Sequence, residues 1–167
     1  IFWDRQAGLY RGYIRDIHNV PESGDLNSGI RDIRYIESKD FKTWTDPVLL
    51  DFGEDAEDYP LYTNVVQPYY RAPQICIGFP SRYMERAAWN GSFEELCGKE
   101  RRRQRMTVHP RYGLTATDYV FMCSRDGVKF HRFDEAFLRP GIENGVNWVY
   151  GDCYPARGMF ESPSPIN

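Results

Sequence analysis

The stretch Ser38-Lys39-Asp40-Phe41-Lys42-Thr43-Trp44 has a counterpart in Ser124-Arg125-Asp126-Gly127-Val128-Lys129-Phe130. Each copy follows a strand-like segment and places an Asp two residues after the Ser and an aromatic residue six residues after it. Ser and Asp side chains accept hydrogen bonds from backbone amides in tight turns, and an aromatic residue on the returning strand packs between sheets. The pattern predicts a β-hairpin at each copy, with Trp44 and Phe130 buried and the two Asp residues in structural roles.

A third, degenerate copy lies between these two. It runs through Ile77-Gly78-Phe79-Pro80-Ser81-Arg82, with Tyr83 where the Asp would stand. The serines at 38, 81 and 124 are therefore 43 positions apart both times. A period of this size is typical of β-propeller blades. We therefore expect the three serines at equivalent strand-to-turn positions of successive blades.

Short strand-like segments recur between turn signals, at residues 9–15, 30–38, 48–50, 61–70, 72–79, 117–124, 129–133, 146–150 and 154–161. This recurrence, with almost no amphipathic helix, predicts an all-β antiparallel architecture. Residues 85–111 lack the strand signal, carry a capping-box pattern at Ser92–Glu95, and are interpreted as an inserted surface loop. We expect one β-propeller-like domain over residues 1–167.

The period implies about three blades, whereas a closed propeller needs four or more. The sequence therefore predicts part of a larger propeller, or a ring that other chains close by self-association across open blade edges. The chain begins at Ile1 inside a strand-like segment, which suggests a processed or truncated chain.

Composition limits the classes of partner. The 167 residues carry a formal charge of -3, which gives no general attraction to nucleic acid or to an anionic membrane. An Arg-rich run at 101–105 is interrupted by Gln and favours a solvated surface over a phosphate-binding one. No apolar run approaches the roughly 20 residues of a membrane span, and no leader pattern is present. Localisation stays open, secreted and periplasmic locations included.

Metal and cofactor sites are not expected. The four cysteines, at 76, 97, 123 and 153, match no close-paired zinc pattern, and they leave a disulfide open. The three histidines, at 18, 109 and 131, show neither metal-ligand spacing nor a nucleophile motif. The sequence therefore predicts no metal and no cofactor.

A string of motifs carries a resemblance to a known group. It consists of Leu61-Tyr62-Thr63-Asn64, Tyr70-Arg71-Ala72-Pro73, Gly78-Phe79-Pro80-Ser81-Arg82-Tyr83, Thr117-Asp118, Phe121 to Gly127, Ala136 to Gly141 and Asn147-Trp148. In these motifs the chain resembles uncharacterised bacterial proteins related to the five-bladed propellers of glycoside hydrolase families 32 and 43. The resemblance implies the propeller fold and a carbohydrate ligand. The three-carboxylate motifs of the better-known relatives are missing, since Arg15-Asp16 and Arg31-Asp32 lack a following Pro and no Glu-Cys pair exists.

Glycosidic bond cleavage needs two carboxyl groups facing each other across the sugar. Asp118 opens an apolar strand, Asp152 lies in an aromatic stretch, and Glu161 follows Met159-Phe160, so these three are the candidate catalytic residues. Each also has a structural interpretation as a turn cap or a solvated edge. Asp16 and Asp32 each follow an Arg in the sequence, so we expect both to form salt bridges.

Seven residues are candidates for substrate binding. The arginines could hold acidic groups of a glycan in a bidentate manner, and the aromatic residues could stack on a sugar ring, although both types also serve as scaffold and core. The candidates are Tyr62, Asn64, Arg71, Arg82, Arg125, Trp148 and Tyr154. The leading hypothesis is a glycoside hydrolase-like propeller that binds an oligo- or polysaccharide and hydrolyses it with paired carboxylates. The alternative is a noncatalytic propeller segment for carbohydrate or protein interaction.

Overall fold

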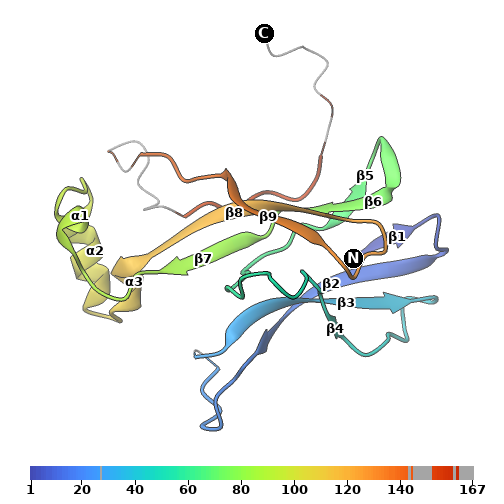
Figure 1. Ribbon diagram of the computed structural model, residues 1–167, viewed down its shortest axis with the longest axis horizontal. Helices are drawn as coiled ribbons and strands as arrows, with labels where there is room; N and C mark the ends of the chain where they lie inside the picture. The colour runs from blue at the N-terminus through green and yellow to red at the C-terminus, as the bar shows by residue number, and fades with distance from the viewer. Residues whose placement is uncertain (27, 143, 145–151, 160, 162–167) are drawn as a thin grey trace.

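A computed structural model describes the chain except for residues 27, 143, 145–151, 160 and 162–167. Nine strands and three short helices are found in this part (Figure 1). The strands are β1 (Phe2–Asp4), β2 (Leu9–His18), β3 (Ile30–Ser38), β4 (Val48–Leu49), β5 (Gln67–Tyr69), β6 (Ala72–Gly78), β7 (Ser81–Glu85), β8 (Thr115–Ser124) and β9 (His131–Leu138). The helices are α1 (Gly91–Glu94), α2 (Lys99–Met106) and α3 (Arg111–Leu114). The chain is mostly antiparallel β structure, so the all-β class is confirmed.

The strands form two antiparallel sheets of similar design. In the first sheet the order is β1-β2-β3-β4, the order of the chain. In the second, β5 pairs with β6, while β6 and β7 pair with successive halves of one side of β8. Strand β9 pairs with the other side of β8. The described residues therefore form two meanders, with β6 and β7 together serving as one interrupted strand.

Most of the expected strands are present, and β3 has the predicted bounds. Three segments differ. Residues 61–66 form no strand beyond an isolated bridge at Leu61, residues 152–159 form none, and β7 was not expected as a strand. The predicted strand at 146–150, with Trp148, lies outside the described residues.

The two serine turns are equivalent. The Ser38 and Ser124 hydroxyls accept hydrogen bonds from the amides of Phe41 and Gly127, at 2.9 Å in both cases. The Asp126 carboxylate accepts from the next two amides, Val128 and Lys129, and Asp40 does the same in the first turn. Each turn connects the third strand of its sheet to the fourth. The predicted structural role of the two Asp residues is confirmed.

The middle copy differs, and the three-blade interpretation is wrong for the described residues. Ser81 begins β7 instead of ending a strand, and its hydroxyl bonds to the Cys153 carbonyl. The structural repeat therefore joins Ser38 to Ser124, one turn in each of two meanders. Phe130 is 2% exposed as predicted, whereas Trp44 is only partly buried, so that prediction is corrected.

One hydrophobic core joins the sheets. Tyr13, Ile33 and Tyr35 from the first sheet pack with Met122 from the second sheet and with Phe130, directly before β9. Backbone bonds link the sheets at two places. The Leu61 amide donates to the Arg31 carbonyl at 2.9 Å while the Tyr62 amide donates to Ser81, and the Asp51 amide donates to Val128 at 3.0 Å. The segment between β4 and β5 is therefore fixed against both sheets.

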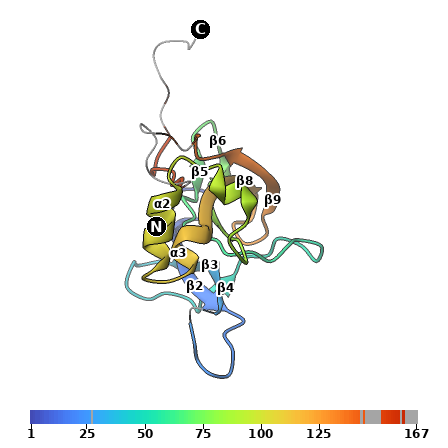
Figure 2. The same ribbon diagram turned by 90° about the vertical axis from the view of Figure 1, so that its left-hand side faces the viewer.

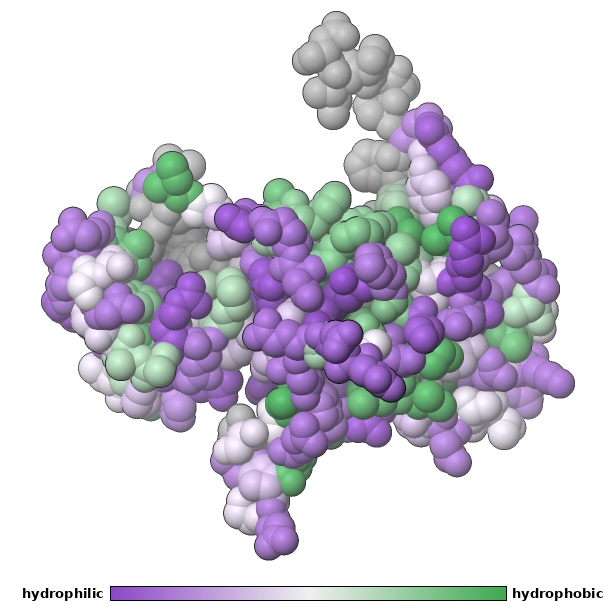
Figure 3. All heavy atoms as spheres, in the orientation of Figure 1, coloured by the Kyte–Doolittle hydropathy of each residue, from purple (hydrophilic) through white to green (hydrophobic). Residues whose placement is uncertain are grey.

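The opposite face of the second sheet carries aromatic residues. Phe79, Tyr119, Phe121, Phe133 and Phe137 contact one another, with ring centroids 5.1 Å apart for Phe79 and Phe137. Phe137 is 60% exposed and Phe133 is 45% exposed. In the space-filling view, apolar residues interrupt the polar surface along the upper edge of the molecule, above β8 and β9 (Figure 3).

The insert expected as a surface loop is helical. Asn90, not Ser92, caps α1 by accepting the Ser92 amide. Helix α2 buries Arg102, whose guanidinium donates to the Gly113 carbonyl at 3.0 Å and so ties α2 to α3. Figure 2 looks onto this end of the molecule, with α2 and α3 in front of the sheets. No helix in the described part of the chain is long and apolar enough to cross a membrane.

Candidate functional site

Asp118 is held by Arg82 across β7 and β8. Arg82 donates from Nε to Oδ1 at 3.0 Å and from Nη2 to Oδ2 at 2.7 Å. The Asp118 side chain is 4% exposed, and Arg82 also donates to the Asp134 carbonyl and lies over the Tyr59 ring. Both residues were expected in the site, as catalyst and ligand. Because each residue is the partner of the other, the two form a buried structural ion pair instead.

The structure does not bring Asp118 and Asp152 to one face. The Thr117 hydroxyl donates to Asp152 at 3.3 Å and accepts from the Cys153 amide at 2.7 Å. Thr117 and Asp118 are consecutive on β8, and consecutive strand residues point to opposite faces. The expected shared cleft of these two carboxylates is therefore corrected. Asp152 remains a candidate by itself.

The remaining predicted residues are dispersed. Glu161 and Arg71 form an exposed ion pair with each other, with side chains 63% and 58% exposed. The Asn64 amide donates to the Tyr13 carbonyl and its oxygen accepts from the Val66 amide, so Asn64 organises the backbone between the sheets. Arg125 is exposed on the second serine turn. Trp148 lies outside the described residues.

Three predicted residues do meet, in a cleft of about 320 Å³. We call it the arginine cleft. It is bounded by β3, β7, the helical insert and the segment at 152–154. Its lining is Arg31, Tyr62, Tyr83, Arg105, His109, Arg111, Tyr112, Thr115, Asp152 and Tyr154. Tyr62, Asp152 and Tyr154 were expected from the sequence, and the other residues were not.

Aromatic rings and guanidinium groups alternate in the arginine cleft. The Tyr62 and Tyr154 rings lie 5.8 Å apart, and the Arg31 guanidinium is 6.0 Å from the Tyr62 ring. Arg111 lies over the Tyr83 ring at 5.2 Å and donates to its hydroxyl at 3.1 Å. Burial and the neighbouring charge of Asp152 raise the pKa of Tyr154, so its phenol stays protonated and can donate a hydrogen bond.

Arginines outnumber carboxylates in the lining of the arginine cleft. Arg31, Arg105 and Arg111 line it together with one carboxylate, Asp152, among the described residues. Arg111 also reaches Glu85 at 3.4 Å, beside the cleft. Guanidinium groups match the planar geometry of carboxylate and sulfate, and tyrosine rings stack on flat apolar surfaces. The arrangement is therefore suited to a ligand with both an acidic group and a stackable ring.

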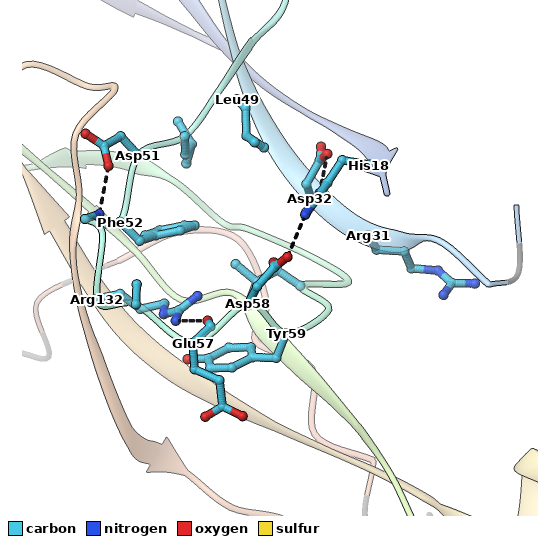
Figure 4. Close-up of a pocket in the computed structure, with 14 residues that line it drawn as sticks. His18, Arg31, Asp32, Leu49, Asp51, Phe52, Glu57, Asp58, Tyr59 and Arg132 are labelled. Atoms are coloured by element: carbon cyan, nitrogen blue, oxygen red, sulfur yellow. Dashed lines mark hydrogen bonds and ion pairs between the residues drawn. The ribbon is translucent and has the colours of Figure 1, made fainter. Parts of the chain in front are cut away.

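A second cavity, of about 400 Å³, shares Arg31 with the arginine cleft but is lined by more carboxylates than arginines, namely Asp32, Asp51, Glu57 and Asp58 against Arg31 and Arg132. His18 lies between two carboxylates, with Nδ1 3.0 Å from Asp32 and Nε2 2.9 Å from Asp58 (Figure 4). On the other side, Arg132 lies over the rings of Phe52 and Tyr59, at 4.6 and 3.9 Å. We call the His18, Asp32 and Asp58 group the histidine bridge.

The histidine bridge holds the segment between β4 and β5 against β3. Asp32 is 4% exposed, and Arg34 also donates to both of its oxygens at 3.1 Å. This confirms the expected salt-bridge role of Asp32, while Asp16 lies 3.2 Å from Arg34. Burial opposes a charge on His18, but its hydrogen bonds to Asp58 and Asp32 outweigh burial and raise the pKa of the imidazole. Within the described residues no group of three His, Cys, Asp or Glu could hold a metal.

Sequence reasoning missed the residues that the insert supplies. Arg105, His109, Arg111 and Tyr112 line the cleft because Arg111 of α3 bonds to Tyr83 of β7 and Arg102 ties α2 to α3, contacts that no local pattern signals. All four cysteines are free thiols, so the disulfide left open is not formed. No protein-family model, no curated protein and no solved structure was found to match this chain.

Proposed function

We propose that this domain binds carbohydrate and that an acidic glycan occupies the arginine cleft. The single observation that carries the proposal is the convergence of Arg31, Arg111, Tyr62 and Tyr154 on one cleft. A carboxylate or sulfate group would bind the guanidinium groups, while the pyranose ring would lie against the tyrosine rings. The excess of arginine over carboxylate supports an acidic glycan rather than a neutral one.

Binding is supported better than hydrolysis. Cleavage needs a second carboxyl group roughly 5 to 9 Å from the first, one protonated and one ionised. Asp152 is the only carboxylate among the described residues that line the cleft, and Asp118 is paired with Arg82 on the other face of the strand. The noncatalytic alternative is therefore the function that we propose.

The proposal includes a propeller-type arrangement of the two sheets. Two meanders with the same strand order and the same serine turn before the fourth strand support consecutive blades. An experimental structure in which the two sheets do not share an axis would contradict this part.

The binding test uses hexagalacturonate and a sulfated heparin hexasaccharide, titrated calorimetrically into the wild type and into Arg111→Ala and Tyr154→Ala. Each substitution should weaken binding of the preferred glycan about tenfold, since each removes one charge-assisted or stacking contact. Arg125→Ala is the matched control, because Arg125 is exposed and does not line the cleft. Equal affinity in all four proteins, or no binding, would contradict the proposal.

The same glycans test for hydrolysis. Products separated by anion-exchange chromatography after long incubation should be absent for the wild type. Turnover by the wild type that disappears in Asp152→Asn would instead establish a glycoside hydrolase and restore the leading hypothesis of the sequence.

A further inference from the structure

A pocket of about 290 Å³ lies beside the first serine turn, and the arginine cleft shares no residue with it. We call it the Trp44 pocket. Its apolar wall is made by Leu9 and Trp44, and its polar lining includes Glu37, Lys39, Asp40 and Thr45. An aromatic wall with polar groups around it is the composition of a small-ligand site.

The Trp44 ring is fixed by a chain of aromatic contacts. Phe41 meets Trp44 with ring centroids 5.5 Å apart, and Tyr10 meets Phe41 at 5.0 Å and Trp3 at 4.7 Å, all edge to face. Phe41 is 53% exposed and Trp3 is 45% exposed. The turn after β3 therefore lies against the β1–β2 hairpin, at the right of Figure 1, and presents large rings to solvent.

The second serine turn provides an internal comparison. Phe41 and Gly127 occupy the same position, three residues after the Ser, and both have a left-handed backbone, with φ of 63° and 89°. Glycine adopts that region freely, whereas a bulky residue is strained there. In the second turn, Gly127 also lets the Arg11 guanidinium approach the backbone, because an added Cβ would lie 2.3 Å from that guanidinium. The hydrogen bonds of the turn thus form equally well without a ring at this position.

The aromatic residue six positions after the Ser also differs between the two turns. Phe130 is 2% exposed in the core that joins the sheets, whereas Trp44 lies partly exposed in its own pocket. A strained, exposed Phe and a partly exposed Trp are therefore not required by the turn. Backbone strain at a bulky residue is a feature that proteins retain at functional sites.

The lining groups define the class of ligand. Glu37 and Asp40 supply carboxylates, and Glu37 is oriented by the Tyr35 hydroxyl, which donates to it at 2.5 Å. The Lys39 ammonium makes no hydrogen bond or ion pair with any described residue, so it can donate to a ligand. Two carboxylates against one ammonium disfavour an acidic ligand and suit one that is rich in hydroxyl groups.

We propose that the Trp44 pocket is a second carbohydrate subsite, which binds a pyranose ring of a neutral glycan against Trp44 and bonds its hydroxyls to Glu37 and Lys39. Phe41 acts as a positioning residue that fixes the Trp44 ring. The subsite does not depend on the arginine cleft, because the two share no lining residue and have opposite charge.

The test titrates cellohexaose, mannohexaose and laminarihexaose into the full chain. At least one should bind and shift the Trp indole signals in NMR spectra. Trp44→Ala should weaken that binding by at least about tenfold, the effect of losing one aromatic contact surface. Phe41→Gly copies the second turn, so it should weaken binding several-fold while the melting temperature changes little, because relief of backbone strain offsets the lost ring contacts.

Two controls make the result decisive. The double variant Arg111→Ala with Tyr154→Ala disrupts the arginine cleft and should bind the neutral hexasaccharide like the wild type. Trp44→Phe places the residue of the second turn and should retain part of the affinity. The proposal is overturned if none of the three glycans binds at millimolar concentration, if Trp44→Ala binds like the wild type, or if neutral binding is lost only in the cleft variant.

Discussion

Arg82 and Asp118 form a two-bond ion pair across adjacent strands, at 3.0 and 2.7 Å, at the register position where β7 and β8 face each other. Asp118 is the most buried of the three expected catalysts, yet its charge is already matched. The Arg82 guanidinium occupies both carboxylate oxygens, whereas a general acid must be within hydrogen-bond reach of the substrate oxygen that it protonates. Burial of a carboxylate therefore marks a structural pair here.

The first prediction concerns this pair. Arg82→Leu should lower the free energy of unfolding by roughly 3 kcal/mol, because it leaves a buried carboxylate without its partner. The double variant Arg82→Leu with Asp118→Leu should recover much of that loss, since no unpaired charge remains. Urea denaturation measures both. If the double variant loses as much unfolding free energy as the single variants Arg82→Leu and Asp118→Leu lose together, the broken ion pair is not the cause of the instability.

The second prediction concerns the second serine turn. The Asp126 carboxylate accepts two amides, at 2.8 Å each, and Ser124 accepts a third. Asp126→Ala should therefore cost about 1 kcal/mol of unfolding free energy, as the loss of a comparable cap does. Glycan affinity should not change. A weaker glycan affinity with unchanged thermal stability would move Asp126 from the scaffold into a binding site.

The third prediction concerns the insert. Arg102 is 5% exposed and donates to the Gly113 carbonyl, so it connects the two helices that carry Arg105 and Arg111 to the cleft. Arg102→Met keeps much of the volume but removes the donors. Hydrogen exchange of residues 99–114 should become faster, and hexagalacturonate binding should weaken several-fold, while exchange in β2 and β3 stays as in the wild type. Unchanged exchange in the insert would show that Arg102 does not hold it.

The sequence predicted local features well and contacts between distant residues poorly. Strand β3 was predicted with its observed bounds because a loose alternation of side chains follows a segment of loop composition, and the serine turns were predicted because their bonds span three residues. Strand β7 was missed because Ser81 was assigned to a turn by analogy of spacing, whereas its partner Thr63 and its contact with Cys153 decide its role.

The candidate site shows the same limit. Helix α2 has no apolar stripe, since its one buried side chain is Arg102, so helical periodicity could not reveal it. Asp152 meets Thr117 across 35 positions in sequence, and the two faces of β8 separate it from Asp118. Which carboxylates share a cleft depends on such long-range placement, and residue type alone does not encode it.

The fourth prediction concerns the histidine bridge, in which protonation places a positive charge on His18 between the two carboxylates. Asp32 on β3 and Asp58 on the following segment face its two ring nitrogens, and Arg34 and Asp16 lie next to Asp32. The pKa of His18 is raised in the folded state because its bonds to the two carboxylates outweigh burial. Its contribution to stability is therefore complete below the unfolded value, near pH 6.5, and is lost as the pH rises through the higher folded pKa.

His18→Gln removes this titration and keeps a polar side chain. The difference in unfolding free energy between the wild type and His18→Gln should be largest near pH 6 and should shrink steadily toward pH 9, and urea denaturation across that range measures it. His131→Gln is the matched control, because His131 is exposed and its ring lies against Phe133, away from the histidine bridge. In the wild type, hydrogen exchange at the Leu61 amide, which bonds to Arg31, should accelerate over the same pH interval beyond the intrinsic rise of exchange with pH. Parallel stability profiles for wild type and His18→Gln would show that the imidazole is not charged between the two carboxylates.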